Sequence, residues 1–246
     1  MGSDDNKLRT KILQEINEDF HDGAKLNQAI TLKYEGEGEN EEELPTILNE
    51  LVRCFEEQDD TIRELASRAI IKVASTEKGR QTLIELEIIP LIKDLFNDEV
   101  IQIRANAYKA MIAVAEFTHG IDQIIHIGIL PVLIDKLVEE KIEVILILIL
   151  QLLKVLMEGE MAPMVIQSSD ALGRLNSHLT SPEYKIRELS AMNLGSISYN
   201  QIGKEQAIEA HSIPPLCTML SDKVSEVRTA ATRALNSLAQ AKEGKV

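Results

Sequence analysis

The chain repeats itself with a period near 41 residues. Arginine recurs at one phase of this period, glycine at a second and proline at a third. The arginines are Arg63, Arg104, Arg187 and Arg228, the glycines are Gly79, Gly120, Gly203 and Gly244, and the prolines are Pro90, Pro131 and Pro214. The arginine and glycine sets share the gaps 41, 83 and 41, so both skip the same copy. A period of this length built from helical patterns indicates an α-solenoid, in which each unit packs on its neighbours.

Each period contains signals for three helices. Residues 129–137 carry apolar side chains at helical spacing, with Pro131 near the helix start, where its missing N–H costs nothing. Asp98, and likewise Asp59 and Asp222, lies in the break before a longer, alanine-rich helix, where an N-cap or turn residue is expected. A loop glycine and a short apolar helix complete the unit. Three helices favour the armadillo repeat over the two-helix HEAT repeat, and the Gly-Ile-Leu-Pro-x-Leu junction at 128–133 is similar to that of armadillo proteins.

We therefore predict an all-α, right-handed α-solenoid of about five armadillo-type repeats. The repeats are expected at A 44–75, B 76–116, C 117–157, D 158–198 and E 199–246. Residues 1–43 lie outside the period and form an acidic arm with a glutamate-rich linker. Its apolar stripe, spaced by four residues, consists of Leu8, Ile12, Ile16 and Phe20. Such a helix either caps the first repeat or binds a partner protein.

Composition limits the class of ligand. The net charge of −14 argues against nucleic acid and anionic membranes as partners. The five histidines are scattered, and no constellation predicts catalysis, a metal site, a cofactor or a small-molecule substrate. Cys54 and Cys217 are expected to be small buried hydrophobes in a reducing compartment. Because no catalytic constellation is found, the protein is expected not to be an enzyme. No apolar targeting segment is recognisable, so a cytoplasmic protein is expected.

Repeat C departs from the period. Ile145 stands where arginine is expected, inside an apolar run over residues 144–150. The run is too short to cross a membrane, because charged and polar residues flank it. The phase of the repeat makes it the long helix of its unit. Either neighbouring helices bury this helix, or it presents an apolar patch to a partner.

The third helices would line a concave groove. Peptide-binding armadillo proteins carry a Trp-Ala-Leu-Ser-Asn pattern there, whereas the tryptophan phase here holds Arg68, Lys109, Leu150, Met192 and Arg233. The asparagine phase holds Lys72, Ala113, Lys154, Ser196 and Ser237. A receptor for basic import peptides is therefore disfavoured. Arg68, Lys72, Lys109, Lys154 and Arg233 instead predict a basic stripe that suits an acidic partner segment.

Several short segments carry a resemblance to a known family. They are Gly79-Arg80, residues 96–98, residues 104–110, Gly120 with Ile124-Ile125, and residues 243–245. Together they resemble the armadillo-repeat proteins of the axonemal radial spoke, the radial spoke head 14 family. The resemblance implies a non-catalytic structural subunit in the axoneme of cilia or flagella, with radial spoke or doublet microtubule proteins as partners. A cytosolic adaptor that binds a partner peptide in its groove is the alternative.

Two further sets complete the expectations. The recurring arginines are expected to bond carbonyls or carboxylates of the neighbouring repeat and so to stabilise the stack. A helix that caps a solenoid is expected to carry lysine or glutamate at every outward position, and the long helix of repeat E does not. Its last apolar edge, near Leu235 and Leu238, is therefore expected to be partly uncovered. A partner or a second copy would cover that edge, unless long basic side chains do so within the chain.

Overall fold

The fold was analysed in a computed structural model, which describes residues 10, 48–49, 51–159 and 170–240. The chain divides into two compact units, Met1–Gly120 and Ile121–Val246, and each is described by itself. In the described ranges the regular elements are all helices, as predicted. None of these helices is long and apolar enough to cross a bilayer. The arm residues Leu8, Ile12, Ile16 and Phe20 lie outside the described residues.

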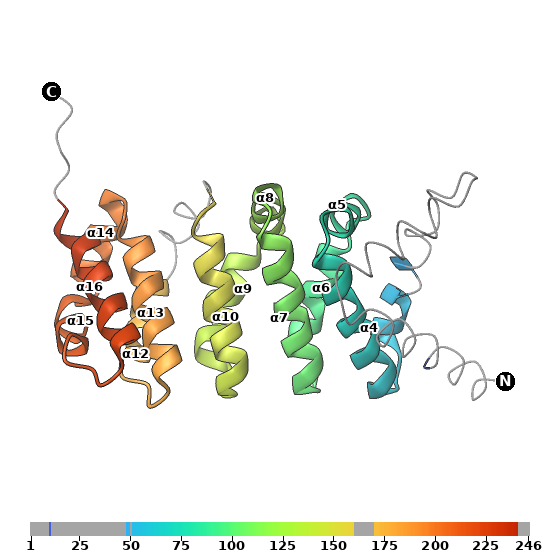
Figure 1. The fold of residues 1–246 in the computed structure, drawn as a ribbon, viewed down its shortest axis with the longest axis horizontal. Helices are drawn as coiled ribbons and strands as arrows, with labels where there is room; N and C mark the ends of the chain where they lie inside the picture. The colour runs from blue at the N-terminus through green and yellow to red at the C-terminus, as the bar shows by residue number, and fades with distance from the viewer. Residues whose placement is uncertain (1–9, 11–47, 50, 160–169, 241–246) are drawn as a thin grey trace, which may run out of the picture. The chain divides into compact units, whose positions relative to one another are not determined.

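The first unit contains one complete three-helix repeat. It begins with η1 (Cys54–Glu56) and the long helix α4 (Asp60–Ala74). The short helix α5 (Glu77–Glu85), then α6 (Ile89–Asp94) with η2 (Leu95–Asn97), and finally the long helix α7 (Ile101–Ala115) form the next repeat. α7 packs along α4 (Figure 1), and Phe96 of η2 stacks on Tyr108 of α7 with ring centroids 3.9 Å apart.

The second unit repeats the same order. Its elements are α9 (Ile129–Glu139), α10 (Glu143–Leu156), α12 (Ala171–His178), α13 (Tyr184–Ile197), α14 (Gln201–Glu209), α15 (Ile213–Met219) and α16 (Ser225–Ala239). The boundary between the units falls within α8 (Thr118–His126). The long helix α13 lies between α10 and α16 (Figure 1), and α12 packs on α9. The three-helix order is that of an armadillo repeat.

The recurring loop glycines mark a tight turn after each long helix. A Cβ atom on Gly79 would lie 2.0 Å from the carbonyl oxygen of Val73, and one on Gly203 would lie 1.8 Å from that of Ile197. Gly120 stands in the same relation to Val114, at 2.1 Å. In each case the oxygen belongs to the residue six positions earlier. The period in glycine therefore reflects a steric requirement at the start of each short helix.

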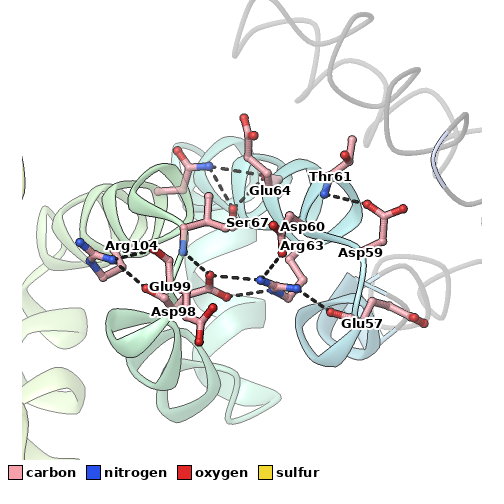
Figure 2. Close-up of polar contacts among 12 residues, drawn as sticks. Glu57, Asp59, Asp60, Thr61, Arg63, Glu64, Ser67, Asp98, Glu99 and Arg104 are labelled. Carbon is pink, nitrogen blue, oxygen red and sulfur yellow. Dashed lines mark hydrogen bonds and ion pairs between the residues drawn. The ribbon is translucent and has the colours of Figure 1, made fainter.

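The recurring arginines share one contact, which we call the arginine clamp. In each case Nη1 donates to the carbonyl oxygen six residues earlier, at 2.8 Å; the pairs are Arg63–Glu57, Arg104–Asp98, Arg187–Ser181 and Arg228–Asp222. The clamp ties the long helix to the loop that precedes it. Figure 2 shows two of these guanidinium groups, Arg63 and Arg104, on either side of the 98–99 loop.

The predicted contact with the neighbouring repeat holds for two clamp arginines. Nε of Arg63 donates to Oδ2 of Asp98 at 2.9 Å, and Nε of Arg187 donates to Oδ2 of Asp222 at 2.8 Å. The bonds of Arg228 go to carbonyls of its own loop, so the prediction is wrong for this residue. Asp98 and Asp222 take the second of the two predicted roles, that of a turn residue: each side chain accepts the N–H two residues on, at Val100 and Val224. Asp59 does cap its helix, α4.

Most of the apolar run of repeat C is buried, although Val144 at its start is 53% exposed. Within α10 the residues Ile145, Leu146, Leu148, Ile149, Leu150, Leu152 and Leu153 are all buried. Packing against other helices, rather than display of a patch, accounts for this composition.

One prediction about the core is wrong: Cys54 is buried, but Cys217 is exposed, because it lies on the outer side of α15, over which no described helix packs.

Candidate protein-binding groove

The long helices of the second unit form a hollowed face. A hollow of about 360 Å³ is lined by one or more residues from α10, α13 and α16, together with the turns that follow α10 and α13. Its lining includes Lys154, Met157, Met192, Tyr199 and Arg233. Gly195 allows the close approach of α13 and α16, since a Cβ atom there would lie 3.1 Å from the Cα of Ala234. We call this hollow the groove.

The groove continues along α13 and α16 toward their N-terminal ends. A second hollow, of about 230 Å³, shares Met192 and Arg233 with the first and adds Glu188, Glu226 and Thr229. The charge therefore changes along the face, from basic at Lys154 and Arg233 to acidic at Glu188 and Glu226. An extended segment lying along it would meet both signs in a fixed order, which favours one orientation of binding.

Lys154 and Arg233 are available to a ligand. Lys154 is half-buried and Arg233 is exposed, and neither makes a hydrogen bond or ion pair with any residue in the described ranges. Tyr199 follows α13 and is 78% exposed, more than Tyr184 at 44% and Phe117 at 40%. Cationic groups beside an exposed phenol ring suit a segment that combines a carboxylate with an apolar or aromatic side chain.

The remaining members of the predicted basic stripe lie in the first unit. Arg68 is exposed and forms an ion pair with Glu64 on the same helix, α4. Burial is the main cause that lowers the pKa of Lys72, one turn further on, and the nearby charge of Arg68 is the smaller cause. Lys109 is exposed on α7. The structure thus brings Lys154 and Arg233 to one hollow, whereas a single stripe of all five residues stays a prediction.

Sequence reasoning found part of the groove. Leu150, which shares the phase of Arg233, is fully buried and contributes nothing to the face. Tyr199 was missed as a site residue, although Phe117 holds the same phase one repeat pair earlier and is also exposed. Aromatic residues directly after the long helix were the signal. Leu235 and Leu238, predicted near an uncovered edge, are half-buried.

No group of three or more His, Cys, Asp or Glu residues in the described ranges is placed to hold a metal ion. The groove residues themselves offer two cations, two carboxylates, methionines and a phenol. This set can bind and orient a polypeptide through ion pairs and apolar contact.

Comparisons with known proteins agree with the fold. The pattern of the HEAT repeat matches residues 213–241, which form α15 and α16. A search of curated proteins finds no match to the chain. An engineered protein of known structure superposes with a TM-score of 0.80, at 21% identity, over 97% of this chain and 95% of its own. A designed armadillo repeat protein superposes with a TM-score of 0.71, at 22% identity, over 93% of this chain and 99% of its own.

A second designed armadillo repeat protein, solved in complex with the peptide (KR)4, superposes with a TM-score of 0.72. It is 22% identical, and the match covers 93% of this chain and 98% of that chain. These likenesses show the fold: the chain is an all-helical repeat protein of the armadillo type. The short first helices α5, α8 and α14 distinguish it from a two-helix HEAT array.

Proposed function

We propose that this chain is a non-catalytic scaffold that binds an extended segment of a partner protein in the groove of the second unit. The single observation that carries the proposal is the pairing of Lys154 and Arg233 at one hollow, without partners among the described residues. A carboxylate of the partner lies between these two cations. An apolar or aromatic side chain of the partner packs on Tyr199 and Met192.

The designed relative was solved with the basic peptide (KR)4, and such a peptide does not suit the two cations of this groove. A basic peptide would meet Lys154 and Arg233 with like charge, which costs binding energy. We therefore propose an acidic segment as the ligand. Because both cations are accessible to solvent, we expect ionic strength to weaken the complex markedly.

A charge-reversal experiment tests the proposal. The double variant Lys154→Glu/Arg233→Glu is compared with Lys141→Glu/Lys223→Glu, which makes the same change in net charge at exposed sites outside the groove. Partners are captured from cell extract by each form at two salt concentrations. Loss of an acidic partner from the groove variant alone supports the proposal. Equal capture by both variants contradicts it.

Within this class, we propose that the chain serves as a structural subunit of the radial spoke of the ciliary axoneme. The support is the resemblance of the segments around Gly79, Asn106, Gly120 and Gly244 to the radial spoke family. A cytosolic adaptor with a diffusible client is the second candidate, favoured by a groove of a size that suits one peptide segment. Capture from ciliated and non-ciliated cells separates the two: spoke and doublet proteins are expected only from the ciliated cells.

A further inference from the structure

The outer side of α15 is an apolar surface with nothing described packed on it. Ile213 and Leu220 are 38% and 42% exposed, and Cys217 between them is also exposed. The three residues are spaced by four and three positions, so they share one face of the helix. We call them the α15 stripe.

The equivalent face earlier in the same unit is buried. Eighty-three residues before the α15 stripe stand Leu130, Ile134 and Leu137 of α9, and they are 0%, 2% and 1% exposed. Helix α12 of the following repeat covers them. Arg174 of α12 donates to the carbonyl of Ile134 at 2.7 Å, and a ring nitrogen of His178 lies 2.7 Å from the carbonyl of Leu137. The α15 stripe is thus a face of the type that a further helix covers.

The long helix beside α15 shows the same contrast. Leu194 and Ile197 of α13 are 0% and 4% exposed, because α16 packs on them. Their equivalents 41 residues later are Leu235 and Leu238 of α16, and both are only half-buried. The α15 stripe and these two leucines therefore belong to the same kind of surface, namely the face by which one repeat packs on the next.

Arg228 supplies the polar part of this surface. Its Nη1 is held by the carbonyls of Asp222 and Lys223 at 2.8 and 3.1 Å, as Arg187 is held by those of Ser181 and Pro182 at 2.8 and 3.0 Å. In Arg187 the other edge of the guanidinium, Nε and Nη2, binds both carboxylate oxygens of Asp222. The same edge of Arg228 binds no described residue. It is a positioned guanidinium fork for which the described residues supply no carboxylate.

We propose that Arg228 and the α15 stripe dock a partner protein through a helix that is preceded by an Asp-x-Val turn. The chemistry of the partner follows from the two occupied forks. Both Asp98 and Asp222 stand two residues ahead of a valine whose N–H they accept, in Asp-x-Val sequences that open a long helix. The partner places such a carboxylate in the Arg228 fork, and its apolar side chains cover the α15 stripe, Leu235 and Leu238. This surface is separate from the groove.

A peptide of residues 199–240 carrying Cys217→Ser is the probe, because it holds an Asp-x-Val start at Asp222. Its dissociation constant for the full chain is measured by fluorescence anisotropy, and the alkylation rate of Cys217 in the full chain reports cover of the stripe. Cys54, the other cysteine, is buried and reacts slowly. We expect binding, slower alkylation, and an affinity about tenfold weaker for the Asp222→Asn peptide, since a charge-assisted pair is lost.

Two chain variants complete the test. Arg228→Lys keeps the charge but lacks the planar fork, and it should show the same loss as the Asn peptide. Lys141→Gln, at an exposed site outside both the groove and the α15 stripe, should bind as the parent does. Failure of the probe to bind, equal affinity of the Asp and Asn peptides, or binding without protection of Cys217 would each overturn the proposal. Cys217 protected by raising the concentration of the chain alone would assign the surface to a second copy and overturn the choice of partner.

Discussion

Arg187 holds the carboxylate of Asp222 in the following repeat by both donors, Nε and Nη2, on one edge of its guanidinium. Nε lies 2.8 Å from Oδ2, and Nη2 lies 3.0 Å from Oδ1. The carbonyl of Asp222 in turn accepts the Nη1 of Arg228. One aspartate thus links the arginines of two successive repeats, and Asp98 does the same for Arg63 and Arg104 (Figure 2). Arginine therefore recurs along the chain because these contacts between repeats recur.

Loss of a link should destabilise the second unit. We expect Arg187→Gln to lower the free energy of unfolding by about 2–3 kcal/mol, because Asp222 loses its charged partner in a partly buried site. Arg228→Gln removes only bonds to its own loop, so its effect should be less than half as large. Denaturant titrations of both variants check the order. Equal effects would show that the fork adds nothing to the loop contact.

The link also predicts sensitivity to acid. The hydrogen bond from Arg187, and then the N–H of Val224, hold the pKa of Asp222 below its ordinary value near 3.8. The folded state therefore favours the ionised carboxylate: its contribution is complete above pH 3.8 and disappears as the pH falls through the depressed pKa. Asp222→Asn should be less stable than the parent at pH 6, and the gap should narrow below pH 3.8. A constant gap over this range would contradict the assignment.

An arginine–aspartate link of this kind should be tolerated in repeat C only if both of its residues are introduced together. Ile145 replaces the arginine, and Ser181 stands where Asp222 stands one repeat later; its hydroxyl accepts the N–H of Glu183 at 3.3 Å in the same manner. We expect Ile145→Arg alone to cost about 3 kcal/mol, since it buries an unpaired charge. Adding Ser181→Asp should recover about 1 kcal/mol or more, measured as the interaction term of a double-mutant cycle. Additive effects would show that the two side chains do not meet.

The glycines provide a steric test. Gly203→Ala places a methyl group 1.8 Å from the carbonyl of Ile197, so the turn must open. Gly128 adopts the left-handed region at φ 72°, but nothing lies within 4 Å of its Cβ position. We expect Gly128→Ala to introduce about 1 kcal/mol of backbone strain and so to lower the melting temperature slightly. Gly203→Ala should lower the melting temperature more. The reverse order would show that contact with Ile197 is not the constraint.

The period alone predicted the helices, their order and the phases of arginine and glycine. It did not predict which carboxylate each arginine binds, although Arg63 and Asp98 show the same spacing of 35 residues as Arg187 and Asp222. This spacing of an arginine and an aspartate is visible in the sequence itself. The exposure of Cys217 and Leu220 was not readable from local pattern, because burial of that helix face depends on whether another helix packs over it. The groove likewise depends on how three separate helices approach one another. The small size of Gly195 allows the close approach of two of them, α13 and α16.

The most direct test of the central claim, a groove that binds an acidic partner segment, uses Tyr199. A photo-reactive benzoylphenylalanine replaces Tyr199 in the groove or, as the control, Tyr184, an exposed tyrosine at the start of α13. Cross-linked peptides from cell extract are then sequenced by mass spectrometry. The account predicts cross-links from position 199, and not from position 184, to a segment with Asp or Glu beside the attached residue. Cross-links from position 184 alone, or from position 199 to basic segments, would contradict it.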